Sequence, residues 1–160
     1  MIDDIDKQIL NIVQCDGRTS NAEIARQVNL AASAVLERIR KLEERGVIRG
    51  YSASVAPKAV GFGLTAFVSV RTNECGDGTD LLLAQIPEVL EVHDVAGEDS
   101  YLIKVRAADP EDLGVLLKEK IKSIPTVVTT RTTVVLQTVK ETMELPLDRC
   151  VNDSGSKRRK

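Results

Sequence analysis

Apolar residues follow helical spacing through the first third of the chain. Residues 2–13 carry an apolar stripe at three- and four-residue intervals, and Asp3 stands where it can cap that helix. The capping-box pattern from Ser20 to Glu23 predicts the start of a second, short helix. A third helix is predicted over residues 32–45. Its inward-facing stripe is Val35, Ile39 and Leu42.

A change of pattern comes after the third helix. Residues 47–53 read as two short strands around Gly50, which predicts a small hairpin or wing. Three helices with a tight middle turn, followed by a hairpin, have the outline of a winged helix-turn-helix. On the apolar pattern alone, a three-helix unit that does not bind DNA is an equally good reading.

In the second half of the chain, apolar and polar residues alternate with a period of two in segments that are separated by helical stretches or turns. The predicted elements are a strand at 64–71, a helix at 80–86, strands at 89–95 and 101–106, a helix beginning at Asp109, and a strand from Val127 to about Val139. This β-α-β-β-α-β order is the ferredoxin-like plan, so the whole chain is expected to be α+β.

These patterns divide the chain into four parts. Residues 1–54 are the predicted winged helix-turn-helix, 55–63 a linker with Pro and Gly, 64–141 the ferredoxin-like domain, and 142–160 an extension. The basic end of this extension is predicted to be disordered and to contact DNA phosphates. Both faces of the last strand carry Val and Leu, so the bare face of the sheet is expected to form a dimer interface.

Composition narrows the class of protein. Aromatic residues make up only 2% of the chain, which disfavours single-strand nucleic-acid binding through base stacking. Without a long apolar run or a secretory leader pattern, we expect a cytoplasmic protein that does not enter membranes. Cys15, Cys75 and Cys150 are far apart, and His93 is the lone histidine, so we expect no metal, no cofactor and no catalytic residue.

Charge is unevenly distributed along the chain. The net charge is −2, yet residues 26–49 hold six basic and three acidic residues. Residues 151–160 hold four basic residues and one acidic residue. A local basic surface can bind phosphates even where the whole chain is acidic.

The chain resembles the Lrp/AsnC (feast/famine) family of regulators over about residues 2–141. The resemblance is carried by residues 6–10, 16–18, 20–25, 35–44 and 46–51, and further on by Pro87-Glu88-Val89, Gly97-Glu98, 101–105 and Arg131-Thr132. It implies DNA-binding dimers that assemble further into octamers, associated with the nucleoid. It also implies a site for a small effector, an amino acid, between sensor domains.

The second helix of a helix-turn-helix enters the major groove, which makes the outward face of the third helix the candidate recognition surface. The candidate base and phosphate contacts are Ser33, Glu37, Arg40 and Lys41, with Arg18 and Arg49 as phosphate contacts. Arg38 lies beside the core stripe, where a phosphate contact and a structural ion pair are equally expected. Ala31 stands where relatives usually have a capping Ser.

The candidate effector site is the loop between the second and third predicted strands. Its residues are Gly97, Glu98, Asp99, Ser100 and Tyr101, joined by Thr130 and Thr132 of the last strand. Gly97 is expected to serve a tight turn or a close approach to the ligand. Ser100 replaces the family Asp that holds an effector amino group, although Glu98 or Asp99 could supply that carboxylate. An ordinary hairpin loop is the alternative.

Two further functions stay open. Siroheme decarboxylases resemble the same family. Such an enzyme is expected to have several histidines and arginines around a large pocket, whereas this chain has one histidine. A ligand-sensing protein without DNA binding is the other alternative, and the retained Ser33, Arg40 and Lys41 disfavour it.

Overall fold

The computed structural model describes residues 2–73 and 78–147, and the chain separates into two units. One unit runs to Ala53 and includes the segment from Lys140, and the other is Ser54–Val139. The segment from Lys140 therefore groups with the first unit, whereas the sequence assigned 142–160 to a separate extension. The predicted disorder of the basic end falls outside the described residues.

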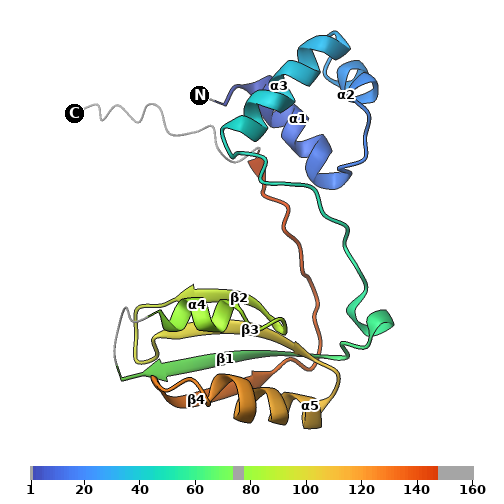
Figure 1. Cartoon of the computed structure of the whole chain (residues 1–160). Coiled ribbons are helices and arrows are strands. Elements are labelled where there is room, and N and C mark those ends of the chain that lie inside the picture. The colour runs from blue at the N-terminus through green and yellow to red at the C-terminus, as the bar shows by residue number, and fades with distance from the viewer. Residues whose placement is uncertain (1, 74–77, 148–160) are drawn as a thin grey trace, which may run out of the picture. The chain divides into compact units, whose positions relative to one another are not determined.

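Three helices build the first unit (Figure 1): α1 spans Asp4–Cys15, α2 Asn21–Gln27 and α3 Ala32–Glu44. The caps form as the sequence predicts, with the Asp3 carboxylate accepting from the Asp6 amide at 2.8 Å and Ser20 Oγ from the Glu23 amide at 3.2 Å. The helices bury a shared apolar core of Ile9, Ile24, Ala25, Val28, Val35 and Ile39.

The turn between α2 and α3 is tight, and Asn29 adopts a left-handed conformation with φ 55°. The hairpin predicted after α3 is wrong, because no residue of 47–53 lies in a strand. The backbone amides of Val47 and Ile48 both donate to the Leu42 carbonyl, at 2.9 and 3.1 Å. Those donors close the end of α3 and are therefore not available to pair with a second strand.

The second unit is a four-stranded antiparallel sheet in the order β2-β3-β1-β4, which confirms the ferredoxin-like plan. A short 3-10 turn, Pro57–Val60, precedes it, and α5 continues as a π-helical stretch, Leu116–Ile121. Its elements are β1 (Leu64–Thr72), α4 (Thr79–Ala84), β2 (Val89–Asp94), β3 (Tyr101–Ala107), α5 (Pro110–Val115) and β4 (Val127–Val134).

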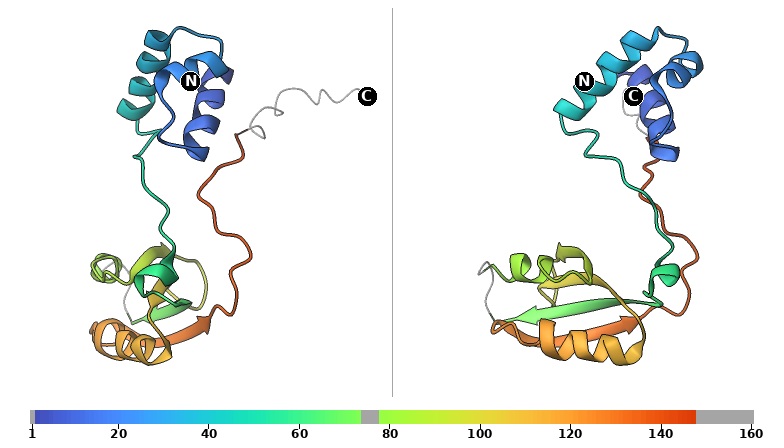
Figure 2. Two further views of the ribbon diagram at one scale, coloured as in Figure 1. Left: turned by 90° about the vertical axis from the view of Figure 1, so that its right-hand side faces the viewer. Right: turned by 45° about the vertical axis from the view of Figure 1, so that its right-hand side comes forward.

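Helices α4 and α5 cover one face of the sheet (Figures 1 and 2), and the main core lies between that face and the two helices. The fully buried sheet residues include Ala66, Val68, Val70, Ile103, Val105 and Ala107. The opposite face is less apolar than the sequence suggested. Paired positions there place Phe67 beside Thr133 and Lys104, and Ser69 beside Arg131. Mostly polar side chains therefore line the face that we expected to be an apolar dimer interface.

The last strand is shorter than predicted, ending at Val134 and not near Val139. Its neighbour β1 begins at Leu64, and the Val135 amide still donates to the Thr65 carbonyl at 2.9 Å. Only Leu64 of β1 lies beyond that point, so the ladder between β1 and β4 ends there.

Candidate functional site

The exposed side of α3 carries the residues that the sequence singled out for DNA contact. Val35, Ile39 and Leu42 are buried at 0%, 8% and 1% exposure, and they fix which side of the helix faces inward. The residues on the outward side are exposed, namely Ser33, Glu37, Arg40 and Lys41. Ala31 makes no side-chain cap, so α3 begins without the hydrogen bond that a Ser would supply.

The charges on this outward side are loosely paired with one another. Glu37 lies 3.4 Å from Arg40 Nε and 3.5 Å from Lys41 Nζ, and Arg40 also lies 3.7 Å from Glu44. The positive charge of Arg40 holds the pKa of the Glu37 carboxyl below its ordinary value. Exposed pairs at these distances contribute little to stability, so the two cations can exchange a carboxylate for a phosphate at low cost.

Arg38 is turned toward α1 instead of outward. Its Nη1 atom donates to Asp3 Oδ2 and to Asp6 Oδ1, each at 2.7 Å. Asp3 and Asp6 also cap α1 reciprocally, with the Asp3 amide donating to Asp6 Oδ2 at 3.2 Å. The guanidinium therefore joins the start of α1 to the middle of α3. The structural ion pair that the sequence left open for Arg38 is formed, while the phosphate contact stays a prediction.

Arg18 and Arg49 flank the helices on exposed positions. Arg18 follows α1 and its backbone amide is held by Asp16, whereas Arg49 follows α3. Neither guanidinium has an acidic partner within the described ranges, so both are open to a phosphate.

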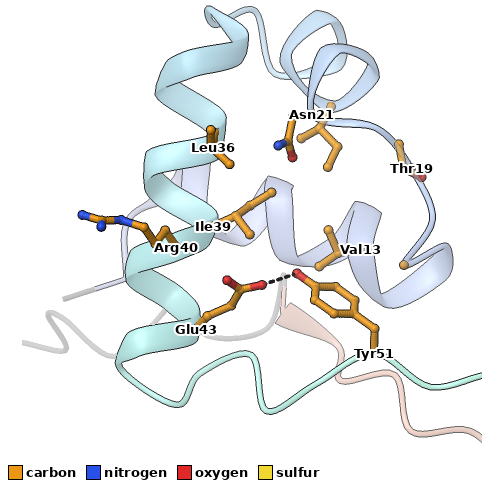
Figure 3. A pocket seen from close by; sticks show the side chains of 10 residues that line it. Val13, Thr19, Asn21, Leu36, Ile39, Arg40, Glu43 and Tyr51 are labelled. Atoms are coloured by element: carbon orange, nitrogen blue, oxygen red, sulfur yellow. Dashed lines mark hydrogen bonds between the residues drawn. The ribbon is translucent and has the colours of Figure 1, made fainter.

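A pocket of about 290 Å³ opens between the α1–α2 turn and α3 (Figure 3). Tyr51 closes one side of it, because its hydroxyl donates to Glu43 Oε1 at 3.1 Å and its ring packs on Gly17. A Cβ on Gly17 would lie only 3.0 Å from that ring, so the glycine makes room for it. Arg40 is among the residues that line the pocket, and its guanidinium end points away from Tyr51 in Figure 3. The sequence showed Gly17 and Tyr51 in its motifs without revealing their contact.

The loop after β2 is tied to the bare face of the sheet by charge. Arg131 donates to Asp99 at 2.6 Å, and Arg71 Nε donates to the Glu98 carbonyl at 3.0 Å and lies 4.0 Å from Asp99. The Asp99 side chain is 14% exposed, whereas that of Glu98 is 84% exposed. Ser100 Oγ lies 2.9 Å from Thr72 Oγ1 and accepts from the Thr72 amide at 3.2 Å, so it joins the loop to β1.

The remaining effector candidates do not gather with this loop. Tyr101 is 6% exposed and pairs in register with Val70, so it belongs to the core face. Thr130 and Thr132 are opposite Val70 and Val68, on the same helix-covered face and away from Arg131. The structure thus brings together Glu98, Asp99 and Ser100 and separates them from the other three.

Of the two reasons expected for Gly97, the structure does not show the left-handed turn, and the close approach to a ligand stays a prediction. The φ of Gly97 lies outside the left-handed range and a Cβ there would meet no atom within 4 Å. Neither a tight turn nor a close approach within the described chain requires a glycine at this position.

In the part of the chain that the structure describes, no group of three or more His, Cys, Asp or Glu side chains is arranged to hold a metal ion. His93 is exposed, with Nε2 3.3 Å from Glu91. Cys15 is exposed and free, while Cys75 and Cys150 fall outside the described residues. Within the described residues, no helix is long and apolar enough to cross a membrane.

A compact helix-turn-helix joined to a separate ferredoxin-like unit defines a class of DNA-binding protein with a ligand-binding domain. Residues 2–49 match the family described as winged helix-turn-helix DNA-binding, and residues 65–145 match the Lrp/AsnC ligand binding domain. The chain belongs to the Lrp/AsnC family of transcriptional regulators.

Relatives and solved structures agree with this placement. The chain is 40% identical over 148 residues to the HTH-type transcriptional regulator FL11 of Pyrococcus horikoshii, covering 91% of this chain and 97% of that one. It is 36% identical to the leucine-responsive regulatory protein of Escherichia coli, over 90% of each chain. A transcriptional regulator of Neisseria meningitidis, solved with L-methionine, superposes with a TM-score of 0.86 at 31% identity, covering 92% and 98%. The feast or famine regulatory protein of M. tuberculosis, also complexed with L-methionine, gives 0.85 at 38% identity, covering 91% and 99%.

Proposed function

We propose that the outward side of α3 reads the operator through Ser33, Arg40 and Lys41, with Arg18 and Arg49 on the phosphates. The observation that carries this proposal is the burial of Val35, Ile39 and Leu42, which leaves the basic side of the helix exposed. Arg40 and Lys41 suit guanine edges or phosphates, and Glu37 can accept from a cytosine amino group.

Fluorescence anisotropy on the DNA upstream of the chain's own gene, across a salt series, tests this proposal. We expect tight, salt-dependent binding that Arg40→Ala/Lys41→Ala abolishes. Lys118→Ala/Lys122→Ala removes the same charge from exposed positions of the other unit and should leave binding intact. Equal losses in both double variants would refute the assignment to α3.

For the effector we propose an amino acid held at the loop after β2. Glu98 is the carboxylate that suits an ammonium group, because it is 84% exposed and its contact with Arg71 is long, at 3.5 Å. Asp99 is only 14% exposed and is bound by Arg131 at 2.6 Å. The two L-methionine complexes of relatives support this ligand class. Calorimetry with the proteinogenic amino acids tests it, and Glu98→Gln should weaken any binding more than Asp94→Asn, an exposed carboxylate on β2.

The proposed mechanism couples effector to assembly. The chain forms dimers that assemble toward octamers at the nucleoid in the cytoplasm, and the effector shifts that assembly by binding one state more tightly. Light scattering that shows one unchanged oligomer with and without a tightly bound ligand would contradict the coupling.

The chain is not an enzyme in this proposal. Its characterised relatives are named as transcriptional regulators, which supports that reading. Incubation with siroheme tests the alternative, since a decarboxylase would show visible absorbance and form product.

A further inference from the structure

One large apolar side chain is left exposed on the helices of the first unit. Leu36 is 54% exposed, whereas its neighbours Val35 and Ile39 are 0% and 8% exposed. No other large apolar side chain of α1, α2 or α3, all of which the structure describes, is exposed. Single exposed leucines are common on protein surfaces, so the surroundings of Leu36 decide whether it has a role.

Leu36 lies within the surface that we propose for reading the operator. Residues three and four positions apart are neighbours on a helix, so Leu36 has Ser33 on one turn and Arg40 on the next. It is the fifth residue of α3, in the half of a recognition helix that meets base edges. The polar side chains around it read bases by hydrogen bonds, which a leucine cannot make.

The pocket beside α3 gives an incoming group access to this leucine. Leu36 is one of the lining residues, and Figure 3 shows it on the side of α3 that faces the pocket. Apolar side chains of all three helices line the same pocket, namely Val13, Ile24 and Ile39. A small apolar group that approaches Leu36 would therefore leave water on more than one side.

The chemistry of the major groove limits what Leu36 can contact there. The four base pairs present hydrogen-bond donors and acceptors, and thymine alone adds an apolar group, its 5-methyl. A protein partner would be expected to need a much larger apolar patch. Leu36 is instead followed by the exposed charged residues Glu37 and Arg40, so the apolar surface is of the size that a methyl group covers.

We propose that Leu36 contacts the 5-methyl group of a thymine in the operator and is a specificity-determining residue of α3. The contact makes the helix prefer an A·T pair over a G·C pair at that position, because cytosine has no such methyl. This inference rests on the proposed DNA binding and adds an apolar contact to the polar contacts of Ser33, Arg40 and Lys41.

A cycle that combines a protein variant with a DNA variant tests the contact. The DNA upstream of the chain's own gene is prepared once with thymidine and once with deoxyuridine, which lacks only the 5-methyl group. Fluorescence anisotropy then compares the full chain with Leu36→Ala on both fragments. Leu90→Ala is the matched control, because Leu90 is also 54% exposed but lies on β2. Leu36→Met keeps an apolar side chain of similar size.

We expect wild type to bind the thymidine fragment about fourfold more tightly for each methyl group contacted. Leu36→Ala should bind the two fragments within about twofold of each other, because any effect of the methyl groups on the shape of the DNA is common to both proteins. Its salt slope should equal that of wild type, since no phosphate contact is lost. Leu90→Ala should keep the wild-type ratio, and Leu36→Met most of it.

Thermal unfolding of Leu36→Ala checks that the fold is retained, and the substitution of a half-exposed side chain should change the melting temperature little. Single deoxyuridine substitutions then identify the thymine, which should matter to wild type and not to Leu36→Ala.

Two results would overturn the inference while leaving the proposed function intact. One is strong preference of wild type for this DNA over random DNA, with equal affinity for the thymidine and deoxyuridine fragments. The other is the same ratio between the two fragments in wild type and in Leu36→Ala. A wild-type chain that binds no DNA would overturn both proposals.

Discussion

Arg38 offers the sharpest separation between a residue that touches DNA and one that positions the recognition helix. Its guanidinium bridges Asp3 and Asp6 at 2.7 Å each, and Asp6 is only 7% exposed. Arg38→Ala would leave the Asp6 carboxylate without its cation in a largely buried place. The perturbation should therefore act on the packing of α1 against α3.

The size of the effect depends on burial. A hydrogen bond between charged groups contributes about 1.5–3 kcal/mol, and exposed ion pairs contribute about 1 kcal/mol or less. The Arg38 side chain is 32% exposed, so we place the loss for its bond to Asp6 between these values, at about 1–2 kcal/mol. For a domain of this size, the unfolding midpoint should fall by about 4–8 °C for each kcal/mol.

Two measurements test the reasoning together: thermal unfolding and the salt dependence of DNA binding. Arg38→Ala should lower the melting temperature yet leave the salt slope unchanged, whereas Arg40→Ala should reduce the slope by about 0.9 with little effect on melting. Both bonds come from the single Nη1 atom, so Arg38→Lys, whose ammonium keeps the charge and several donors on a flexible stem, should recover part of the stability. A slope that falls by about 0.9 in Arg38→Ala, with melting unchanged, would refute the structural role.

Three further predictions concern the same unit. Ala31→Ser should stabilise the chain by about 0.5–1 kcal/mol in urea unfolding, since φ −72° and ψ 145° suit a capping side chain; no gain would show that the start of α3 is satisfied otherwise. Glu37→Gln should raise affinity for random DNA in filter binding, because it removes the carboxylate that competes with phosphate for Arg40; weaker binding would contradict that competition. The Asp6 amide, and then Arg38, hold the pKa of Asp3 below its ordinary value. Stability from Asp3 is therefore present above about pH 4 and lost as the pH falls further, so acid unfolding should be shallower in Asp3→Asn, and equal curves would argue against it.

Sequence periodicity predicted the helices and strands because both depend on local spacing, and the order of these elements along the chain indicated the ferredoxin-like plan. The stripe of Val35, Ile39 and Leu42 specifies the side of α3 that is buried, and that burial leaves Arg40 exposed. The predicted hairpin after α3 failed for a different reason. Whether Val47 and Ile48 pair with a strand or close a helix depends on competition for the same amides, which strand propensity does not describe.

The candidate effector site shows the same limit for side chains. Alternation along β4 indicated that Thr130 and Thr132 share a face, but only the pairing with Val68 and Val70 shows that it is the helix-covered one. The ion pair between Arg131 and Asp99 joins residues that are 32 positions apart in sequence, so no local pattern predicts it. The same holds for the Gln14 side chain, whose Oε1 accepts from the Leu145 amide at 2.7 Å across 131 positions of sequence.

Competition between operator and random DNA tests the central claim most directly, namely that the exposed side of α3 reads sequence. Wild type should prefer the operator about a thousandfold or more at physiological salt, in the presence of the appropriate amino acid where one is required. Arg40→Ala/Lys41→Ala should lose most of that preference while Lys118→Ala/Lys122→Ala keeps it. A preference that survives in the first variant would show that α3 does not carry the recognition.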